Sequence, residues 1–528
     1  MAPSVEAGNP AQDSASGRGG AAAAMVAAGI LLSRIAGLIR DRVFAHFFGN
    51  SDAADAFRAA FRIPNFLQNL FGEGVLSASF IPVYARLRAE GEDERASEVA
   101  EAIFALLFFV TALLVAFGIL ATPWLIDAIA PGFRGAKREL TTDLVRILFP
   151  GAGLLVFSAW CLGVLNSHRK FFLSYTAPVI WNLTLIVALV WRGGHVHASR
   201  LAEILAWASV VGSGLQLGVQ LPVVFGFLWP LRFRLRAGVG EHVRTVLRSS
   251  GPVFVSRGVV QISAYIDSLL ASFLPTGAVA ALSYAQTIYL LPVSLFGMSV
   301  SAAELPAMSS ALGSREEIAK ALRERLAGGL ERIAFFVVPS AAAFVVLGNV
   351  VVATLYRSGV FGANDVTYVW GVLAGSSVGL LASTFGRLYS SAFYALRDTR
   401  TPLNFAVVRV VLTLALGYLF ALPLPPMLGL DRKWGVAGLT LSAGIAGWVE
   451  FGLLRRSLAR RIGRPAYSIA RVGKLWLAAL IAAALGFGLW RISASLHPVL
   501  TGAVVLVPYS LAYLLLTRWM GISTAAEA

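Results

Sequence analysis

The sequence predicts an all-α polytopic membrane protein, and three observations lead to this fold class. Of its 528 residues, 57% are hydrophobic and only 14% are charged, with a mean hydropathy of +0.73. A soluble protein carries about 25% charged residues, so most of this chain cannot face water. Apolar segments long enough to cross a bilayer recur from residue 22 onward, and the loops between them alternate in basic content. These features exclude a soluble multidomain enzyme.

The segments can be taken in chain order. Residues 1–20 are rich in Ala, Gly and Ser and lack the basic start of a secretory signal, so we expect a disordered cytoplasmic tail. A spanning helix needs about 20 mainly apolar residues. Fourteen segments meet this length, and the first two are the least hydrophobic. They are 22–47, 56–84, 102–130, 143–165, 172–191, 201–230, 249–274, 278–310, 333–356, 368–393, 402–420, 435–454, 475–490 and 499–519.

The basic residues predict the orientation of these spans. If the N-terminus is cytoplasmic, the cytoplasmic loops hold 24 Lys and Arg residues and the opposite loops hold 9. Cytoplasmic loops of membrane proteins collect Lys and Arg, so we expect both termini in the cytoplasm. The same rule explains the net charge of +16 without a nucleic-acid domain.

An internal repeat divides the chain. The segment Leu70–Val75 resembles Leu295–Val300 at an offset of 225, and Thr176–Pro178 resembles Arg400–Pro402 at nearly the same offset. Each copy contains six predicted spans, an even number, so the copies should be parallel repeats with a binding cavity between them. We therefore expect an N-lobe at 21–235, a C-lobe at 236–456 and two additional helices at 457–528.

Charged residues inside the first two predicted spans are the candidate site. A charge at the bilayer centre costs about 2.5–3.5 kcal/mol on insertion scales and normally faces the protein interior. Snorkelling at the interface and buried packing pairs are the structural alternatives for these residues. Arginine also suits a phosphate, because its planar fork donates two hydrogen bonds to two oxygens. The candidates here are Arg34, Arg40, Asp41, Asp55, Asn65 and Glu73.

The second half also carries charges within its predicted spans. Arg257 and Glu304 are the candidates for the C-lobe side of the cavity, and Arg387, Arg409 and Glu450 are further intramembrane charges. We expect substitution of Arg257 or Glu304 by Ala to abolish function.

The chain offers no sign of enzyme chemistry. Cys161 is the single cysteine, and the six histidines form no metal-binding spacing. No phosphate-binding GxxxxGK[ST] motif occurs, because Gly473-Lys474 is followed by Leu475. We therefore expect no catalytic residue, no metal site and no bound cofactor.

Several motifs together resemble a known family. They are Ser33-Arg34-Ile35-Ala36-Gly37-Leu38-Ile39-Arg40-Asp41, Ala54-Asp55-Ala56-Phe57, Arg62-Ile63-Pro64-Asn65-Phe66-Leu67 and Gly72-Glu73-Gly74. Pro131-Gly132-Phe133, Leu165-Asn166 and Asp398-Thr399 with Thr401-Pro402 extend the likeness along nearly the whole chain. The sequence resembles the MurJ/MviN family of lipid II flippases, within the multidrug/oligosaccharidyl-lipid/polysaccharide exporter superfamily.

The resemblance implies a function that the pattern alone does not. Such proteins move the undecaprenyl-diphosphate-linked peptidoglycan precursor, lipid II, across the bacterial cytoplasmic (inner) membrane by alternating access, which serves cell wall biogenesis and cell shape. It implies a cationic cavity for the head group, a lipid groove beside the last two spans, and an ion gradient (Na⁺ or H⁺) or the membrane potential as the drive. We expect a monomer in the bilayer, with cell-wall synthesis proteins as further partners.

Some positions of this chain match the family's functional residues and others differ. Arg34, Arg40 and Asp55 match positions that the family uses in or near its cavity, and Asp41, Asn65 and Glu73 match its signature. This chain has Gln68 and Asn69, and Thr287 and Leu290, where many members have charged residues. Two alternatives therefore stay open: an exporter of another polyprenyl-linked glycan or of drugs on the same fold, and an inactive scaffold that recruits envelope proteins.

Overall fold

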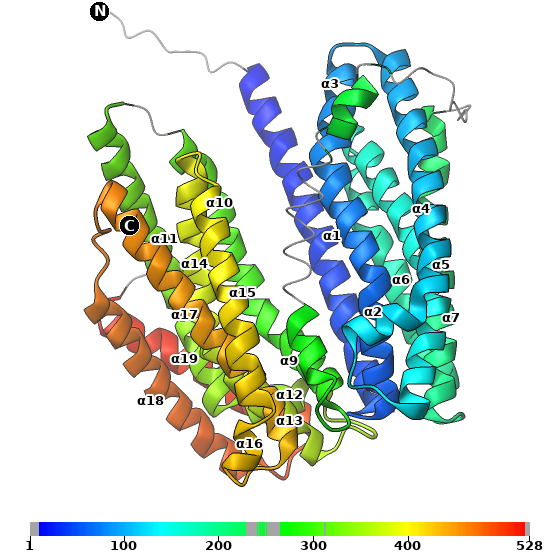
Figure 1. Cartoon of the computed structure of the whole chain (residues 1–528). Coiled ribbons are helices and arrows are strands. Elements are labelled where there is room, and N and C mark those ends of the chain that lie inside the picture. The colour runs from blue at the N-terminus through cyan, green and yellow to red at the C-terminus, as the bar shows by residue number, and fades with distance from the viewer. Residues whose placement is uncertain are drawn as a thin grey trace, which may run out of the picture. The chain divides into compact units, whose positions relative to one another are not determined.

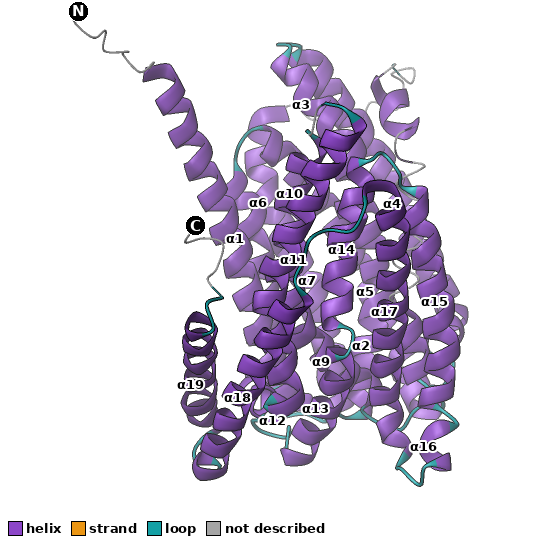
Figure 2. Ribbon diagram, turned by 90° about the vertical axis from the view of Figure 1, so that its left-hand side faces the viewer, coloured by secondary structure: helices purple, strands orange, loops and turns teal. Residues whose placement is uncertain are grey.

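The computed structural model describes residues 10–228, 240, 242–248, 250, 265–310 and 313–522 (Figure 1). Across these residues the chain is helical and contains no strand, only an isolated bridge between Ser358 and Phe361 (Figure 2). The predicted all-α class is confirmed. Residues 1–9 of the predicted tail, and 249 and 251–264 of the predicted seventh span, lie outside the described residues.

The contacts divide the chain into two compact units. Unit 1 comprises Met1–Phe47, Ala59–Ala128 and Arg134–Ile262, and unit 2 comprises Phe48–Arg58, Ile129–Phe133 and Ser263–Ala528. Two short turns of the N-terminal half thus belong to unit 2.

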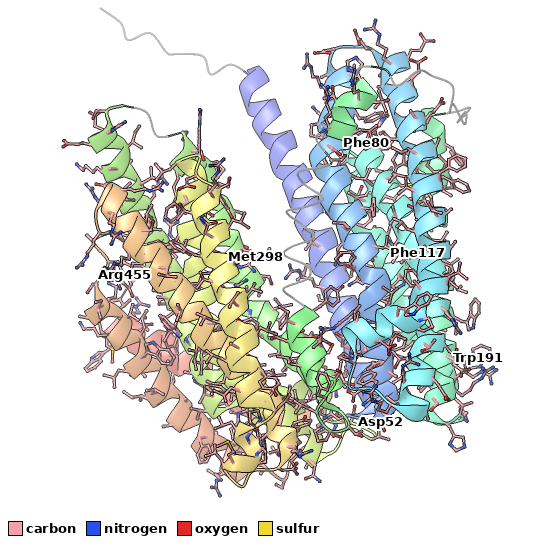
Figure 3. All side chains as sticks on the ribbon, viewed as in Figure 1. Asp52, Phe80, Phe117, Trp191, Met298 and Arg455 are labelled. Carbon is pink, nitrogen blue, oxygen red and sulfur yellow. The ribbon has the colours of Figure 1, made fainter. Side chains whose placement is uncertain are left out.

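Unit 1 is built around α5, whose inner face is buried. Trp160 on α5 is fully buried and packs with Phe80 and Tyr84 in one apolar cluster. The outer side chains of the unit are also apolar: Phe117 on α4 and Trp191 on α6 are 62% and 69% exposed and project outward (Figure 3). Large exposed apolar side chains are typical of a lipid-facing surface. Its helices are α1 Pro10–Phe48, α2 Asp52–Gln68, η1 Asn69–Phe80, α3 Ile81–Ala89, α4 Asp93–Ile129, α5 Gly135–Ser167, α6 Phe171–Arg192 and α7 Ala198–Leu228.

Unit 2 packs its helices around α14. This helix contacts α10, α11 and α17, while α18 and α19 pack against each other and against α11 and α12. The helices are α9 Ala278–Pro292, η2 Val293–Met298, α10 Ser299–Ser309, α11 Arg315–Val346, α12 Gly348–Tyr356, α13 Ala363–Ser377, α14 Leu380–Ala395, α15 Arg400–Ala421, α16 Leu424–Met427, η3 Arg432–Trp434, α17 Gly435–Ile462, α18 Ile469–Ser493 and α19 Pro498–Trp519.

A proline explains how α19 is held on α11. Pro339 lies inside α11 and has no N–H, so the carbonyl of Phe335 loses its helical donor. The hydroxyl of Tyr513 on α19 donates to that carbonyl at 2.6 Å, and Tyr509 donates to the carbonyl of Pro339 at 2.6 Å. An unsatisfied carbonyl in a membrane costs several kcal/mol, so these bonds fix the register of the last helix.

The spans can now be compared with those expected. Within the described residues, ten helices are long and apolar enough to cross a membrane, or eleven if the bent pair α13–α14 is one span. The helices of the first two predicted spans are not among these. The exact total of fourteen therefore stays a prediction.

The start of the ninth predicted span was placed too late in the chain. The ninth span was expected at 333–356, yet α11 begins at Arg315 after a capping box between Ser314 and Glu317. It ends at Val346, and a separate helix follows from Gly348, where a Cβ would lie 2.4 Å from the Trp370 ring. The polar first turns of α11 concealed the helix from a search for apolar segments.

Local geometry supports the sequence repeat. Both Leu-Phe-Gly motifs fall in π-helical stretches, η1 in one copy and η2 in the other. The helices α5 and α14 end in the same way, with left-handed residues Arg169 at φ 57° and Arg397 at φ 59°. The two copies therefore share details of backbone conformation that similarity of sequence alone would not require.

Candidate functional site

Arg40 on α1 is held by three neighbouring side chains. Its Nε and Nη2 donate to Oδ1 of Asp41, at 3.3 and 3.0 Å. Its Nη1 donates to Oδ1 of Asn182 on α6 at 3.0 Å, and its guanidinium carbon lies 5.1 Å from the centre of the Trp181 ring. This is a cation–π distance. An acid, an amide and an aromatic ring thus fix one arginine inside unit 1.

The arrangement leaves Arg40 able to bind an anion. A guanidinium has five N–H donors. Three are used by the bonds above, and within the described residues nothing else engages the remaining two, one on each terminal nitrogen. The side chain is 21% exposed. A positioned fork of this kind suits two oxygens of one phosphate or carboxylate.

The other predicted residues of unit 1 differ in environment. Asp41 is buried and Arg34 is exposed on α1, while Asn65 is partly buried on α2. Asp41 pairs with the adjacent Arg40, at 3.0 Å. The side chain of Glu73 lies outside the described residues. Substrate contact by any of these residues stays a prediction.

Asp55 caps a helix in unit 2. Its side chain is fully buried, Oδ2 accepts from the backbone N–H of Gly277 at 2.8 Å, and Oδ1 accepts from that of Ala280 at 2.8 Å. A carboxylate at a helix N-terminus satisfies free donors and matches the helix dipole. Gly277 has φ +86°, and a Cβ there would lie 2.5 Å from the carbonyl oxygen of Asn50. This position therefore requires glycine.

Further bonds join the α1–α2 turn, residues 48–58, to the rest of unit 2. Asn50 donates to Asp365 at 3.0 Å, and the Tyr284 hydroxyl donates to the carbonyl of Gly49 at 3.0 Å. The guanidinium of Arg58 lies 5.2 Å from the centre of the Tyr284 ring. Asp55 is thus part of this attachment, and its bonds to the backbone of α9 give it a positioning role.

Glu304 on α10 is buried and forms ion pairs. Its carboxylate lies 3.0 Å from Arg332 and 3.7 Å from Arg325, both on α11. Burial of a carboxylate is costly unless it is paired, so these arginines stabilise it. Arg257, its predicted companion, lies outside the described residues.

Thr287 and Leu290 are both uncharged, so that part of α9 carries no charge. The Thr287 hydroxyl donates to the carbonyl of Ser283 in its own helix at 3.1 Å, and Leu290 is 51% exposed. A positively charged contact to an anion in unit 2 has to come from another helix.

The motif Asp398-Thr399 with Thr401-Pro402 has a structural role. Asp398 accepts from the hydroxyl of Thr401 at 2.6 Å and its backbone N–H at 3.0 Å, and pairs with Arg461 at 2.7 Å. The Thr401 hydrogen bonds, together with Arg461, lower the pKa of Asp398 to about 2. The motif fixes the start of α15 against the end of α17.

Two functional candidates were missed in the sequence. Asn182 and Trp181 hold Arg40, but they lie 142 and 141 positions away along the chain. An amide within the apolar segment 172–191 was the available signal, since polar groups inside membrane spans usually have partners.

Comparison with known proteins adds evidence on relationship. A family model described as "Lipid II flippase MurJ" matches residues 44–510. The "Lipid II flippase MurJ" of Burkholderia cenocepacia is 33% identical over 441 residues, which cover 82% of each chain. The "Probable lipid II flippase MurJ" of Rhizobium meliloti is 33% identical over 471 residues, covering 87% of this chain and 85% of the relative.

Solved structures agree on the fold. A lipid II flippase MurJ in an inward closed conformation superposes with a TM-score of 0.76 at 23% identity, covering 94% of this chain and 98% of the other. An inward-facing MATE family transporter of the MOP superfamily gives a TM-score of 0.64 at 18% identity, covering 81% and 95%. At these identities the likeness concerns the fold alone.

Proposed function

The chain belongs to the lipid II flippase MurJ family, and on that premise we propose that it moves the undecaprenyl-diphosphate-linked peptidoglycan precursor, lipid II, across the cytoplasmic membrane. Curated relatives that match more than four fifths of its length carry that name. The relationship also supports a role in cell wall biogenesis and a place in the bacterial inner membrane.

The observation that carries the proposal is the state of Arg40. Placing an arginine within a membrane helix costs free energy, so such residues usually serve a function. Asp41, Asn182 and Trp181 hold this one in place and leave two N–H donors for an anion. A diphosphate is an anion with oxygens at the spacing that such a fork binds.

We further propose transport by alternating access, through a cavity to which Arg40 and Arg34 contribute positive charge. The paired π-helical stretches and the two equivalent helix ends support this, because repeated halves are the usual basis of such movement. Asp55 serves as a positioning residue that keeps the α1–α2 turn attached to α9.

The energy source is proposed on chemical grounds. The sequence lacks a nucleotide-binding motif, so we propose an ion gradient or the membrane potential as the drive. Among the described residues no group of three His, Cys, Asp or Glu side chains could hold a metal ion. We also propose that both termini are cytoplasmic and that cell-wall synthesis proteins are partners.

Growth complementation tests the role of Arg40. A bacterial host would be depleted of its own lipid II flippase and would express the full chain, Arg40→Gln, or the control Arg460→Gln. Arg460 is an exposed arginine in the last turn of α17. We expect growth with the wild type and the control and none with Arg40→Gln at equal membrane amounts. Normal growth with Arg40→Gln would refute the assignment of Arg40.

A further inference from the structure

A single polar stripe marks the surface of α14. From Leu380 to Phe393 every residue is buried except Ser383, Arg387 and Ser390, and the exposed Tyr394 follows. Spacings of four, three and four residues put these side chains on one face of the helix. All other faces of α14 are covered by its neighbours in unit 2.

Arg387 lies near the middle of this helix and is exposed. It comes seven residues after Leu380 and eight before Ala395, about 10–12 Å from each end at 1.5 Å per residue. Within the described residues its guanidinium has no hydrogen bond or ion pair. A charged group does not face hydrocarbon at this depth, so the stripe faces a water-filled space.

A second arginine, on α15, points away from lipid. The most exposed side chains of α15 form an apolar stripe that includes Leu403, Val407, Val411 and Leu414. At about 100° per residue, Arg409 lies about 200° from Val407, on the opposite side of the helix. Arg409 therefore belongs to the protein side of α15.

The two arginines lie on helices that pack against α17, which carries Glu450. Arg409 pairs with Glu450 at 3.2 Å, with the two side chains 39% and 14% exposed. Arg387 lies on α14, and both α14 and α15 pack against α17. The Tyr289 hydroxyl is hydrogen-bonded to Ser383 at 2.9 Å.

The charges of this cluster do not cancel. Glu450 balances one arginine, so a positive charge is left in a hydrated part of unit 2, surrounded by hydroxyl donors. An unbalanced arginine fork with neighbouring hydroxyls is the chemistry that recognises a phosphate group. The cluster comes from α9, α14, α15 and α17, so packed helices set its geometry.

We propose that Arg387 and Arg409, with Arg409 oriented by Glu450, form a phosphate-binding site in unit 2 that takes the diphosphate of the lipid-linked substrate. This inference rests on the proposed function and supplies the anion contact that Thr287 and Leu290 do not provide. The phosphate of a membrane phospholipid has the same chemistry, so the test has to separate the two sources.

The test measures binding to the purified full chain in detergent, with lipid II as one probe and phosphatidylglycerol as the other. Charge-assisted hydrogen bonds of the usual strength predict that Arg387→Gln and Arg409→Gln each weaken lipid II binding by about 10- to 100-fold. The control Arg460→Gln removes an exposed charge elsewhere in unit 2 and should bind as the wild type does. Arg387→Lys keeps the charge, so it should lose less affinity than Arg387→Gln.

Each outcome has a separate meaning. Equal lipid II binding by the wild type and both Gln variants would overturn this site and leave the proposed function intact. A wild type that does not bind lipid II would refute the proposed function and this site with it. Loss of phosphatidylglycerol binding alone would show that the site holds a phospholipid head group. Thermal unfolding of each variant excludes misfolding, and a folded Arg387→Lys that binds as weakly as Arg387→Gln would contradict the role of charge.

Discussion

Substitution of Asp55 by Ala should free the N-terminus of α9. The change removes the acceptor of two buried N–H groups, those of Gly277 and Ala280. An unsatisfied buried donor costs about 1–3 kcal/mol, so two donors cost about 2–6 kcal/mol in sum, which already includes the usual loss of about 0.5–2 kcal/mol for a capping side chain. Water can reach a helix end more easily than a core, so we expect the lower part of the summed range. The free energy needed for local opening at the N-terminus of α9 should fall by about 2–4 kcal/mol.

Hydrogen exchange of the peptide that contains Gly277 and Ala280 measures this directly. A change of about 2–4 kcal/mol corresponds to roughly 30- to 1,000-fold faster exchange at these amides. Asp52→Ala is the matched control, because Asp52 lies on the same helix and accepts from the Thr276 hydroxyl at an exposed position. It should accelerate exchange by less than about tenfold. Unchanged exchange in Asp55→Ala, or an equal effect in both variants, would refute the capping role.

Three further predictions follow from the same contacts. Gly277→Ala should raise exchange in the α1–α2 turn, because its Cβ would lie 2.5 Å from the Asn50 carbonyl; wild-type exchange would contradict this. Arg40→Lys should weaken lipid II binding by about tenfold or more, since lysine lacks the planar fork; unchanged affinity would argue against a bidentate contact. The pKa of Asp398, lowered to about 2 from about 3.9 when unfolded, gives stability that is present above about pH 4 and lost as the pH falls to 2. Asp398→Asn should flatten that part of the melting-temperature profile, and a profile identical to the wild type would refute the assignment.

The fold class was predictable because the hydrophobic effect acts on every segment separately. The apolar runs at 102–130 and 143–165 needed no tertiary information to be identified as helices. They match α4, which ends one residue earlier at Ile129, and α5. The position of a break within a span depends instead on how the helices pack. The predicted span 368–393 is two helices bent by 41°, and the carbonyl of Val378 in the break accepts from the Trp448 indole at 2.8 Å, a partner 70 positions away.

The sequence predicted which charged residues belong to the candidate site better than it predicted their arrangement in space. The charges of α1 identified Arg40 and Asp41, which do pair. A place for Asp55 near the substrate stays a prediction. The bonds of its oxygens to the backbone of α9 could not be predicted, because the partner amides lie more than 220 positions further along the chain. Arg387, Arg409 and Glu450 were visible in the sequence only as separate charges, and the packing of α14 and α15 on α17 relates them in space.

The exposure of lipid II on the outer face of the membrane tests the central claim most directly. In a host depleted of its own flippase, expression of this chain should make lipid II accessible to a reagent that does not cross the membrane. Arg40→Gln at the same membrane level should not do so. Absence of accessible lipid II, despite wild-type chain in the membrane, would contradict the proposed transport activity.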